Sequence, residues 1–176
     1  MKKIVLFLFL IPILAFSQFD KTIKLKVAMI QNCVKKDTLG ETTFWQTKGK
    51  VTFGIVQYTQ NQNVIFKNLF IKQYQELLPI YNKMIISEDS NDTDLFVKIL
   101  IRQEDDYRNL LKPEQLKAYS DKLLEFENSN PDQNDAYSSL FFSDKLLAEY
   151  KFRFSYKPKV IKPKTIKFSK KTKKVN

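Results

Sequence analysis

The chain contains few residues of the types that carry out most enzyme chemistry. Its 176 residues include no histidine and one cysteine, Cys33. A Ser-His-Asp triad, a Cys-His pair and a histidine-ligated zinc site are therefore excluded. One cysteine cannot form an internal disulfide, so we expect a buried, inert thiol, with pairing between chains as the alternative. We expect no cofactor and no metal site, and a binding protein rather than an enzyme.

The residues best suited to a binding role by charge lie at the C-terminal end. Residues 151–176 carry 11 basic and no acidic side chains, whereas residues 18–150 carry 17 basic and 19 acidic ones. A block of like charge repels itself, so we expect an extended tail over 155–176 that is either solvated or bound to an anionic envelope component. Nothing in it indicates sequence-specific binding of nucleic acid. The candidate residues for an anionic partner are Lys157, Lys159, Lys162, Lys164, Lys167, Lys170, Lys171, Lys173 and Lys174.

The N-terminal segment has the pattern of a bacterial signal peptide. Two lysines precede an apolar run from Ile4 to Leu14, and a small-x-small pattern ends at Ser17. The run is shorter than the roughly 20 residues that a membrane span needs. We therefore predict cleavage after Ser17, a periplasmic or secreted protein, and no transmembrane span after cleavage. This divides the chain into a signal peptide over 1–17, a helical domain over 18–154 and the tail.

The domain should be mainly α, a helical hairpin or small helical bundle. Thr59 and Gln62 have the spacing of a capping box, and an apolar stripe at spacings of three and four follows from Phe66 to Met84. Pro79 interrupts that stripe, so we expect a kink or break there. A second helix should begin at a cap on Asp92 or Thr93.

Two further helix starts are predicted nearer the C-terminus. Pro113 favours the first position of a third helix, and Ser143 or Asp144 can cap a last helix that reaches Tyr150. Residues 128–135, around Pro131, are expected to form a loop. The third start places Gln115 three residues after Lys112, at the position where its side chain can reach the capping residue.

The first part of the domain is harder to assign. Residues 20–34 fit a helix face or a strand, and we favour the helix. Residues 36–50 contain Gly40 and Gly49 and are expected to form a loop. Val51, Phe53 and Ile55 alternate, which is the pattern of a short β element near the N-terminus.

Two segments resemble a sequence signature of the Spy/CpxP-like periplasmic family. The signature reads Leu-Thr-x-x-Gln, and here Leu111-Lys112-Pro113-Glu114-Gln115 follows a helix with an aromatic residue near its end. The segment from Tyr58 to Gln62 stands where the family carries an earlier copy. Lys112 replaces the threonine in one copy and Tyr58 replaces the leucine in the other. The resemblance covers residues 58–125.

The resemblance implies a small helical-hairpin protein of the cell envelope. Members of that family act as ATP-independent chaperones or as modulators of envelope stress signalling. Its implied partner is an unfolded client or another protein, held on a helical surface by apolar side chains beside positive charge. The alternative is an exported structural or surface-interaction protein that binds anionic partners through its basic tail.

Overall fold

The computed structural model describes residues 20–87 and 89–158, which form helices without a strand in that part of the chain. The mainly α fold predicted from the sequence is therefore confirmed. The elements in chain order are α2 (Lys21–Val34), the 3₁₀ turn η1 (Asp37–Leu39), α3 (Gly40–Val56), α4 (Gln60–Ser87), α5 (Ser90–Arg108), α6 (Pro113–Glu127), α7 (Pro131–Ser138) and α8 (Asp144–Arg153).

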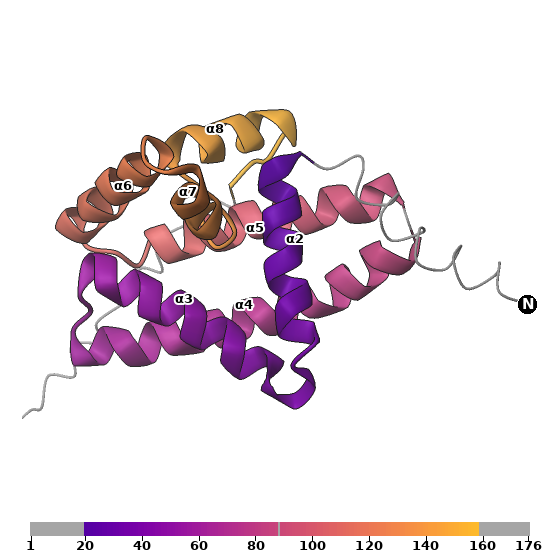
Figure 1. Ribbon diagram of the computed structural model, residues 1–176, viewed down its shortest axis with the longest axis horizontal. Coiled ribbons are helices and arrows are strands. Elements are labelled where there is room, and N and C mark those ends of the chain that lie inside the picture. The colour runs from indigo at the N-terminus through magenta and orange to yellow at the C-terminus, as the bar shows by residue number, and fades with distance from the viewer. Residues whose placement is uncertain (1–19, 88, 159–176) are drawn as a thin grey trace, which may run out of the picture.

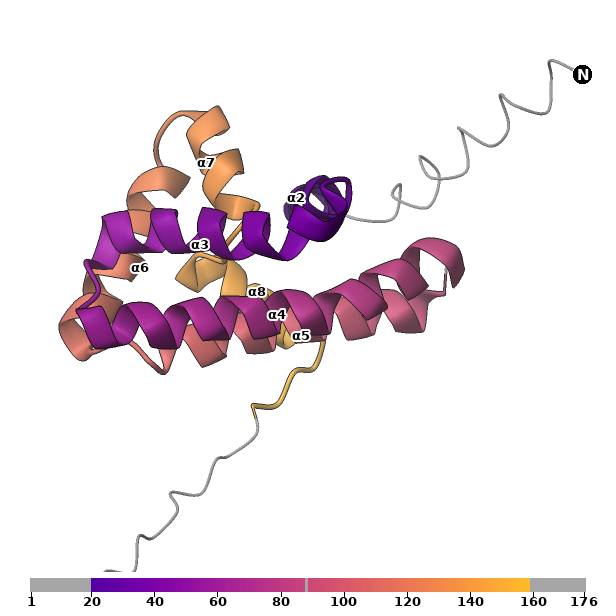
Figure 2. The same cartoon turned by 90° about the horizontal axis from the view of Figure 1, so that it is seen from below.

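A long antiparallel hairpin of α4 and α5 forms the base of the molecule (Figures 1 and 2). Helix α3 runs along α4, and α2 crosses the layer at a steep angle (Figure 1). Helix α6 lies at the same end of the hairpin as α3, α7 contacts α2 and α6, and α8 packs against α5 and α6 (Figure 1). Figure 2 shows α3 and α2 on one side of the α4–α5 pair.

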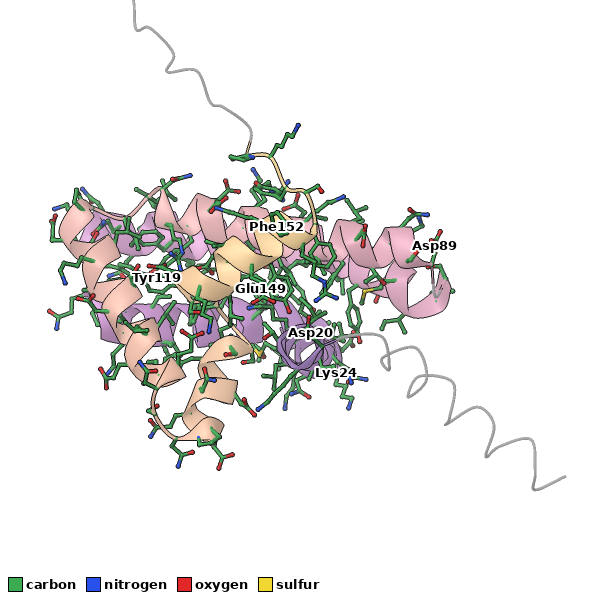
Figure 3. The ribbon with its side chains drawn as sticks, turned by 90° about the horizontal axis from the view of Figure 1, so that it is seen from above. Asp20, Lys24, Asp89, Tyr119, Glu149 and Phe152 are labelled. Carbon is green, nitrogen blue, oxygen red and sulfur yellow. The ribbon has the colours of Figure 1, made fainter. Side chains whose placement is uncertain are left out.

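The helix predicted over residues 20–34 is confirmed. Asp20 caps it, because its carboxylate accepts the backbone N–H of Ile23 at 3.1 Å. Ile23, Val27 and Ile30 share its buried face. Asp20 also accepts hydrogen bonds from Tyr150 and Arg153 of α8, which joins the start of the domain to its last helix (Figure 3).

The loop predicted over 36–50 and the β element predicted over 51–55 are wrong. Both regions form η1 and α3. Gly40 is not a turn residue: it is the first residue of α3, and a Cβ there would lie 2.6 Å from the Cys33 carbonyl oxygen and from the Tyr74 hydroxyl. Its missing side chain allows η1 to bring α3 close against α2 and α4.

Three local predictions near the other helices also need correction. The cap of α5 is Asp89, whose carboxylate accepts the N–H of Asn91 at 2.8 Å, and not Asp92 or Thr93. Asp92 instead binds Lys83. The expected loop over 128–135 is a turn followed by α7, with Pro131 at its first position. No break occurs at Pro79, which lies on the exposed side of a continuous α4, where water can reach the unpaired carbonyl.

The buried apolar side chains form two clusters along the hairpin. One packs α2, the middle of α4 and α5, and α8, with Phe96, Val97 and Ile101 fully enclosed. The other packs the ends of α3, α4 and α5 against α6, with Phe66, Phe70 and Tyr119 enclosed. The predicted helix start at Pro113 and the predicted cap at Ser143 are confirmed, and α8 extends to Arg153.

Some predictions fall on parts of the chain outside the described residues. These are the signal peptide over 1–17, cleavage after Ser17, and the tail lysines from Lys159 onward. Among residues 20–87 and 89–158, no helix has the length and apolar character needed to cross a bilayer.

Candidate functional site

The two motif segments predicted from the sequence form helix caps. In the first, the Gln62 backbone N–H donates to the Thr59 hydroxyl at 3.3 Å, and the Thr59 N–H donates to the Gln62 side chain at 3.1 Å. This is the predicted capping box. In the second, the Lys112 N–H donates to the Gln115 side chain at 3.1 Å. Pro113 and Glu114 are exposed in the first turn of α6, and Leu111 is buried.

The structure also brings these two segments together. The Gln62 side-chain amide donates to Gln115 at 2.8 Å, and the Gln115 amide donates back to Gln62 at 3.1 Å. Close by, the hydroxyls of Tyr58 and Tyr107 are 2.8 Å apart. The pair of hydrogen bonds between Gln62 and Gln115 links the start of α4 to the start of α6. Sequence spacing alone did not indicate this link. It fixes the end of the α3–α4 pair against the rest of the bundle.

An open groove of about 470 Å³ lies between α3 and α4. It has the size of sites that take small molecules or side chains of a partner. Its lining is mainly apolar and includes five aromatic side chains, of which Tyr58, Phe66 and Phe70 are almost fully buried. The lining residues are Trp45, Gln46, Gly49, Lys50, Phe53, Tyr58, Asn63, Phe66, Lys67 and Phe70.

Aromatic exposure and positive charge distinguish this groove from an ordinary helix surface. Phe53 remains 48% exposed. Lys50 and Lys67 are exposed at its edges, and the Lys67 ammonium lies 4.7 Å from the centre of the Trp45 ring. None of the described residues that line the groove is acidic. The arrangement therefore favours an occupant with an apolar part and a nearby negative charge.

Gly49 keeps the groove open. A Cβ placed on it would meet no heavy atom within 4 Å, so its missing side chain leaves space rather than allowing close packing. Gly54, one and a half turns further along α3, is also surrounded by open space but does not line the groove. The two glycines therefore provide a matched pair of positions for experiments.

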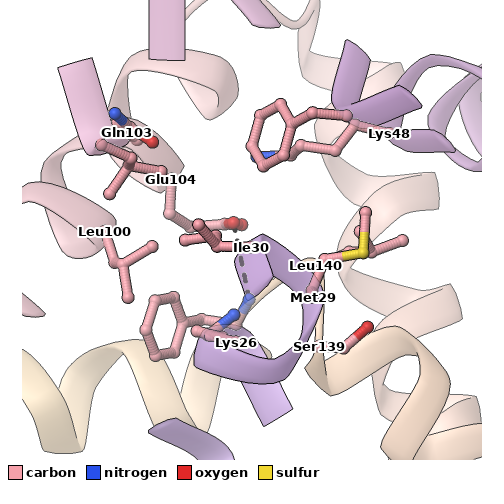
Figure 4. Close-up of a pocket in the computed structure, with 12 residues that line it drawn as sticks. Lys26, Met29, Ile30, Lys48, Leu100, Gln103, Glu104, Ser139 and Leu140 are labelled. Atoms are coloured by element: carbon pink, nitrogen blue, oxygen red, sulfur yellow. Dashed lines mark hydrogen bonds between the residues drawn. The ribbon is translucent and has the colours of Figure 1, made fainter. Parts of the chain in front are cut away.

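A second unusual region is buried beneath α2. The Glu104 carboxylate accepts hydrogen bonds from Arg108 at 2.8 Å and Tyr119 at 2.9 Å, and one at 3.5 Å from the Phe142 backbone, drawn as the dashed line in Figure 4. These donors come from α5, α6 and the segment before α8. Glu104 thus connects three parts of the bundle through charge-assisted hydrogen bonds.

Two lysines lie in the same region with almost no exposure. The Lys26 ammonium donates to the Phe141 carbonyl at 2.7 Å and lies 3.9 Å from the centre of the Phe142 ring. The Lys48 ammonium donates to the Gln73 side chain at 2.9 Å. Burial lowers the pKa of Lys26 to about 7 and that of Lys48 to about 8, and the attraction of Glu104 only partly opposes this.

Cys33 and the acidic residues offer no further chemistry here. Cys33 is buried, as predicted, and burial raises its pKa to about 11, which keeps the thiol protonated and unreactive. Within 20–87 and 89–158, histidine, cysteine and carboxylate side chains form no group of three suited to a metal ion.

The basic residues of α8, just before the tail, pair with acidic residues of the domain. Lys151 pairs with Asp105 at 2.6 Å, and Arg153 pairs with Asp20 at 2.7 Å. Lys157, the one proposed tail lysine within the described residues, is exposed. Two of the 11 basic residues counted from position 151 therefore already have acidic partners within the domain.

Comparison with protein-family models, with curated proteins and with solved structures finds no match for this chain. The candidate site is therefore argued from its own geometry. Sequence reasoning missed the groove because residues 36–50 were assigned to a loop. The missed signal is the four-residue spacing of Trp45, Gly49 and Phe53, which places all three on one face of a helix.

Proposed function

We propose that this chain is an exported, non-enzymatic binding protein that holds unfolded or partner protein chains in the α3–α4 groove. The groove itself is the observation on which the proposal depends. Aromatic side chains line an open hollow of about 470 Å³ with a lysine on each helix at its edge. Exposed apolar surface of this kind is typical of interaction sites. Sites that hold buried aromatic contacts dominate binding energy at protein interfaces.

The chemistry of the groove defines the segment it would hold. The occupant inserts an aromatic or aliphatic side chain beside Trp45 and Phe53, and a neighbouring carboxylate faces Lys50 and Lys67. Burying one such side chain contributes about 1.5–3 kcal/mol. Contacts of this strength are reversible, so holding and release need no ATP. The chain's own lysine-rich tail has the wrong charge for this groove.

The proposed envelope location and the proposed relation to the Spy/CpxP-like family rest on the sequence. Residues 1–17 have the signal-peptide pattern, and two segments resemble the family signature. The contact between Gln62 and Gln115 supports a shared structural role for those two segments. Under this proposal the chain acts as an ATP-independent chaperone or as a modulator of envelope stress.

The decisive experiment measures aggregation of a chemically unfolded client in the presence of residues 18–176. Gly49→Leu fills the groove without a clash at Cβ, so we expect suppression of aggregation to fall at least about tenfold. Gly54→Leu adds the same side chain to the same helix outside the groove, and we expect suppression to be unchanged. Circular dichroism of both variants checks that the helices are retained.

Each result assigns the activity to one region or removes it. Equal suppression by both glycine variants would place the activity outside the groove. No suppression by the unmodified chain would reject the chaperone proposal. A client peptide with its acidic residues changed to amides should bind more weakly, and equal binding would reject the role of Lys50 and Lys67.

The alternative function, adhesion to an anionic envelope component through the tail, is supported by charge alone. Shortening the chain to 18–158 removes every candidate tail lysine except Lys157 while keeping Tyr156, which packs against the domain. Loss of binding to anionic vesicles in this shortened chain, with client holding unchanged, would favour the alternative for the tail and the groove for the domain.

A further inference from the structure

Lys26 and Lys48 are buried without the partners that buried charges usually have. Each ammonium makes one hydrogen bond, to a neutral oxygen, although it carries three donors. No carboxylate of the described residues lies within 4.0 Å of either nitrogen. Glu104, the acidic group that faces them from α5, is already held by Arg108 and Tyr119. Two positive charges at this place are therefore poorly compensated.

The space around the pair is too small to hydrate it. Lys26, Lys48, Gln103 and Glu104 line a small cavity of about 20 Å³, shown in Figure 4. This volume holds about one water molecule. Its remaining walls are mostly apolar side chains such as Phe44, Leu77 and Leu100. One water molecule cannot replace the hydration shells of two ammonium groups. Protonation of both lysines must therefore be accompanied by movement of the surrounding elements.

Helix α2 is the element best placed to move. It lies across the outside of the bundle (Figures 1 and 2) and contributes Lys26, which it fastens to the carbonyl of Phe141. Lys48 lies on α3 and contacts Gln73 of α4. Swinging α2 outward would carry Lys26 to water and would open the cavity that encloses Lys48.

We propose that Lys26 and Lys48 form a proton-binding pair, and that protonation of the pair releases α2 from the layer formed by α3, α4 and α5. The charged group that faces both lysines is Glu104 from α5, which itself binds Arg108 and Tyr119. Glu104 favours the protonated state of both lysines, and the charge of Lys48 opposes protonation of Lys26. The fold is tightest when both lysines are neutral, and it loosens as they take up protons.

The direction of the pH dependence follows from linkage. Lysines in an unfolded chain keep their protons up to about pH 10.4, whereas the folded pair gives them up near neutral pH. Between these limits the unfolded chain binds more protons, so stability rises with pH. Below the lower limit both states are protonated, and the pair contributes no further slope.

The composition of the chain allows this rise of stability with pH to be assigned to Lys26 and Lys48. No histidine is present, and the pKa of the Cys33 thiol is raised to about 11. The α-amino group also titrates near neutral pH, but every variant shares it. A rise in stability between about pH 6.5 and pH 9 therefore reports on the two lysines.

The test is urea unfolding of residues 18–176 at a series of pH values. We expect the unfolding constant to fall up to about tenfold per pH unit for each lysine that titrates. Lys26→Met/Lys48→Met should remove this dependence. Lys24→Met changes an exposed lysine of the same helix (Figure 3) and should retain it. An equal slope in the double variant and in Lys24→Met would overturn the proposal.

Two measurements on the unmodified chain keep the proposal testable if the double variant does not fold. A flat or falling stability between about pH 6.5 and pH 9 would overturn it. Hydrogen exchange should show α2 losing protection relative to α5 as the pH falls to about 6, after correction for intrinsic exchange rates. An unchanged ratio of the two protections would reject α2 as the moving element.

Discussion

Helix α3 differs from most amphipathic helices, because its buried face includes polar residues and its outer face includes aromatic ones. The buried face carries Gly40, Phe44, Lys48, Thr52 and Val56 at every fourth position. The outer face carries Trp45, Gly49 and Phe53, which line the groove. A lysine and a threonine therefore face the core, while Phe53 is exposed and Trp45 is half-buried.

Packing explains the residues of the buried face of α3 but not those of its outer face. Each polar residue on the buried face has a partner: Lys48 binds Gln73, and the Thr52 hydroxyl binds the Lys48 carbonyl at 2.8 Å. Among the described residues, the outer face leaves Phe53 exposed and Trp45 half-buried, and Gly49 leaves room beside them. The residues of the buried face are explained by the stability of the fold. The aromatic residues of the outer face are better explained by binding. Mutations should therefore affect the two faces differently.

The largest effect should come from removing the carboxylate that faces the buried lysines. Glu104→Ala leaves the Tyr119 hydroxyl without its acceptor, takes one of three acceptors from Arg108 and removes a negative charge that favours protonation of Lys26 and Lys48. We expect a loss of about 3–5 kcal/mol in the free energy of unfolding, as for other broken buried ion pairs. Urea denaturation measures it.

Glu149→Ala is the control for this change. Glu149 is an exposed glutamate of α8 (Figure 3), and its removal should change stability by less than about 0.5 kcal/mol. A loss below about 1 kcal/mol for Glu104→Ala would mean that the hydrogen bonds from Arg108 and Tyr119 to this carboxylate contribute little, and the account of this buried region would fail.

The next effect concerns the glycines at the two faces. Gly40→Ala places a Cβ 2.6 Å from the Cys33 carbonyl oxygen and the Tyr74 hydroxyl, so we expect it to destabilise the fold by about 1–3 kcal/mol. Gly54→Ala meets open space within the same helix and should stabilise it by about 0.5–1 kcal/mol. Thermal unfolding of both variants measures the difference in sign. The same sign for both would contradict the close approach at Gly40.

Local signals in the sequence were sufficient to predict several helix boundaries. Thr59, Pro113 and Ser143 were predicted correctly because a cap depends on the chemistry of neighbouring residues. Asp89 was missed because Asp92 has the same chemistry three residues later. Tertiary structure gives Asp92 a different role, in which it binds Lys83.

Helix α3 and the groove could not be predicted in the same way. Lys48 and Thr52 look like surface residues, and Gly40 and Gly49 look like turn residues, so the apolar periodicity of the buried face is hidden. The groove also depends on the pairing of α3 with α4. Its residues come from both helices, and sequence spacing does not show which helices pair.

The smallest effect should come from the contact that joins the two motif segments. Gln115→Ala removes both hydrogen bonds with Gln62, the bond to the Lys112 backbone N–H, and a bond to the Val56 carbonyl at the end of α3. The bonds to Gln62 and to the Lys112 N–H are only partly buried, and each bond contributes about 0.5–1.5 kcal/mol at most. We expect a total loss of about 1 kcal/mol, because water replaces part of what is removed.

Glu114→Ala tests whether the motif acts through this contact or through helix capping in general. Glu114 is exposed in the same turn of α6, and its loss should cost only a few tenths of a kcal/mol through the helix dipole.

Combined with Gln62→Ala, Gln115→Ala should lose less than the sum of the two single effects, because the partners share one contact. Strict additivity would show that the two motif segments stabilise their helices independently, and the end of the groove would then need another explanation for its rigidity.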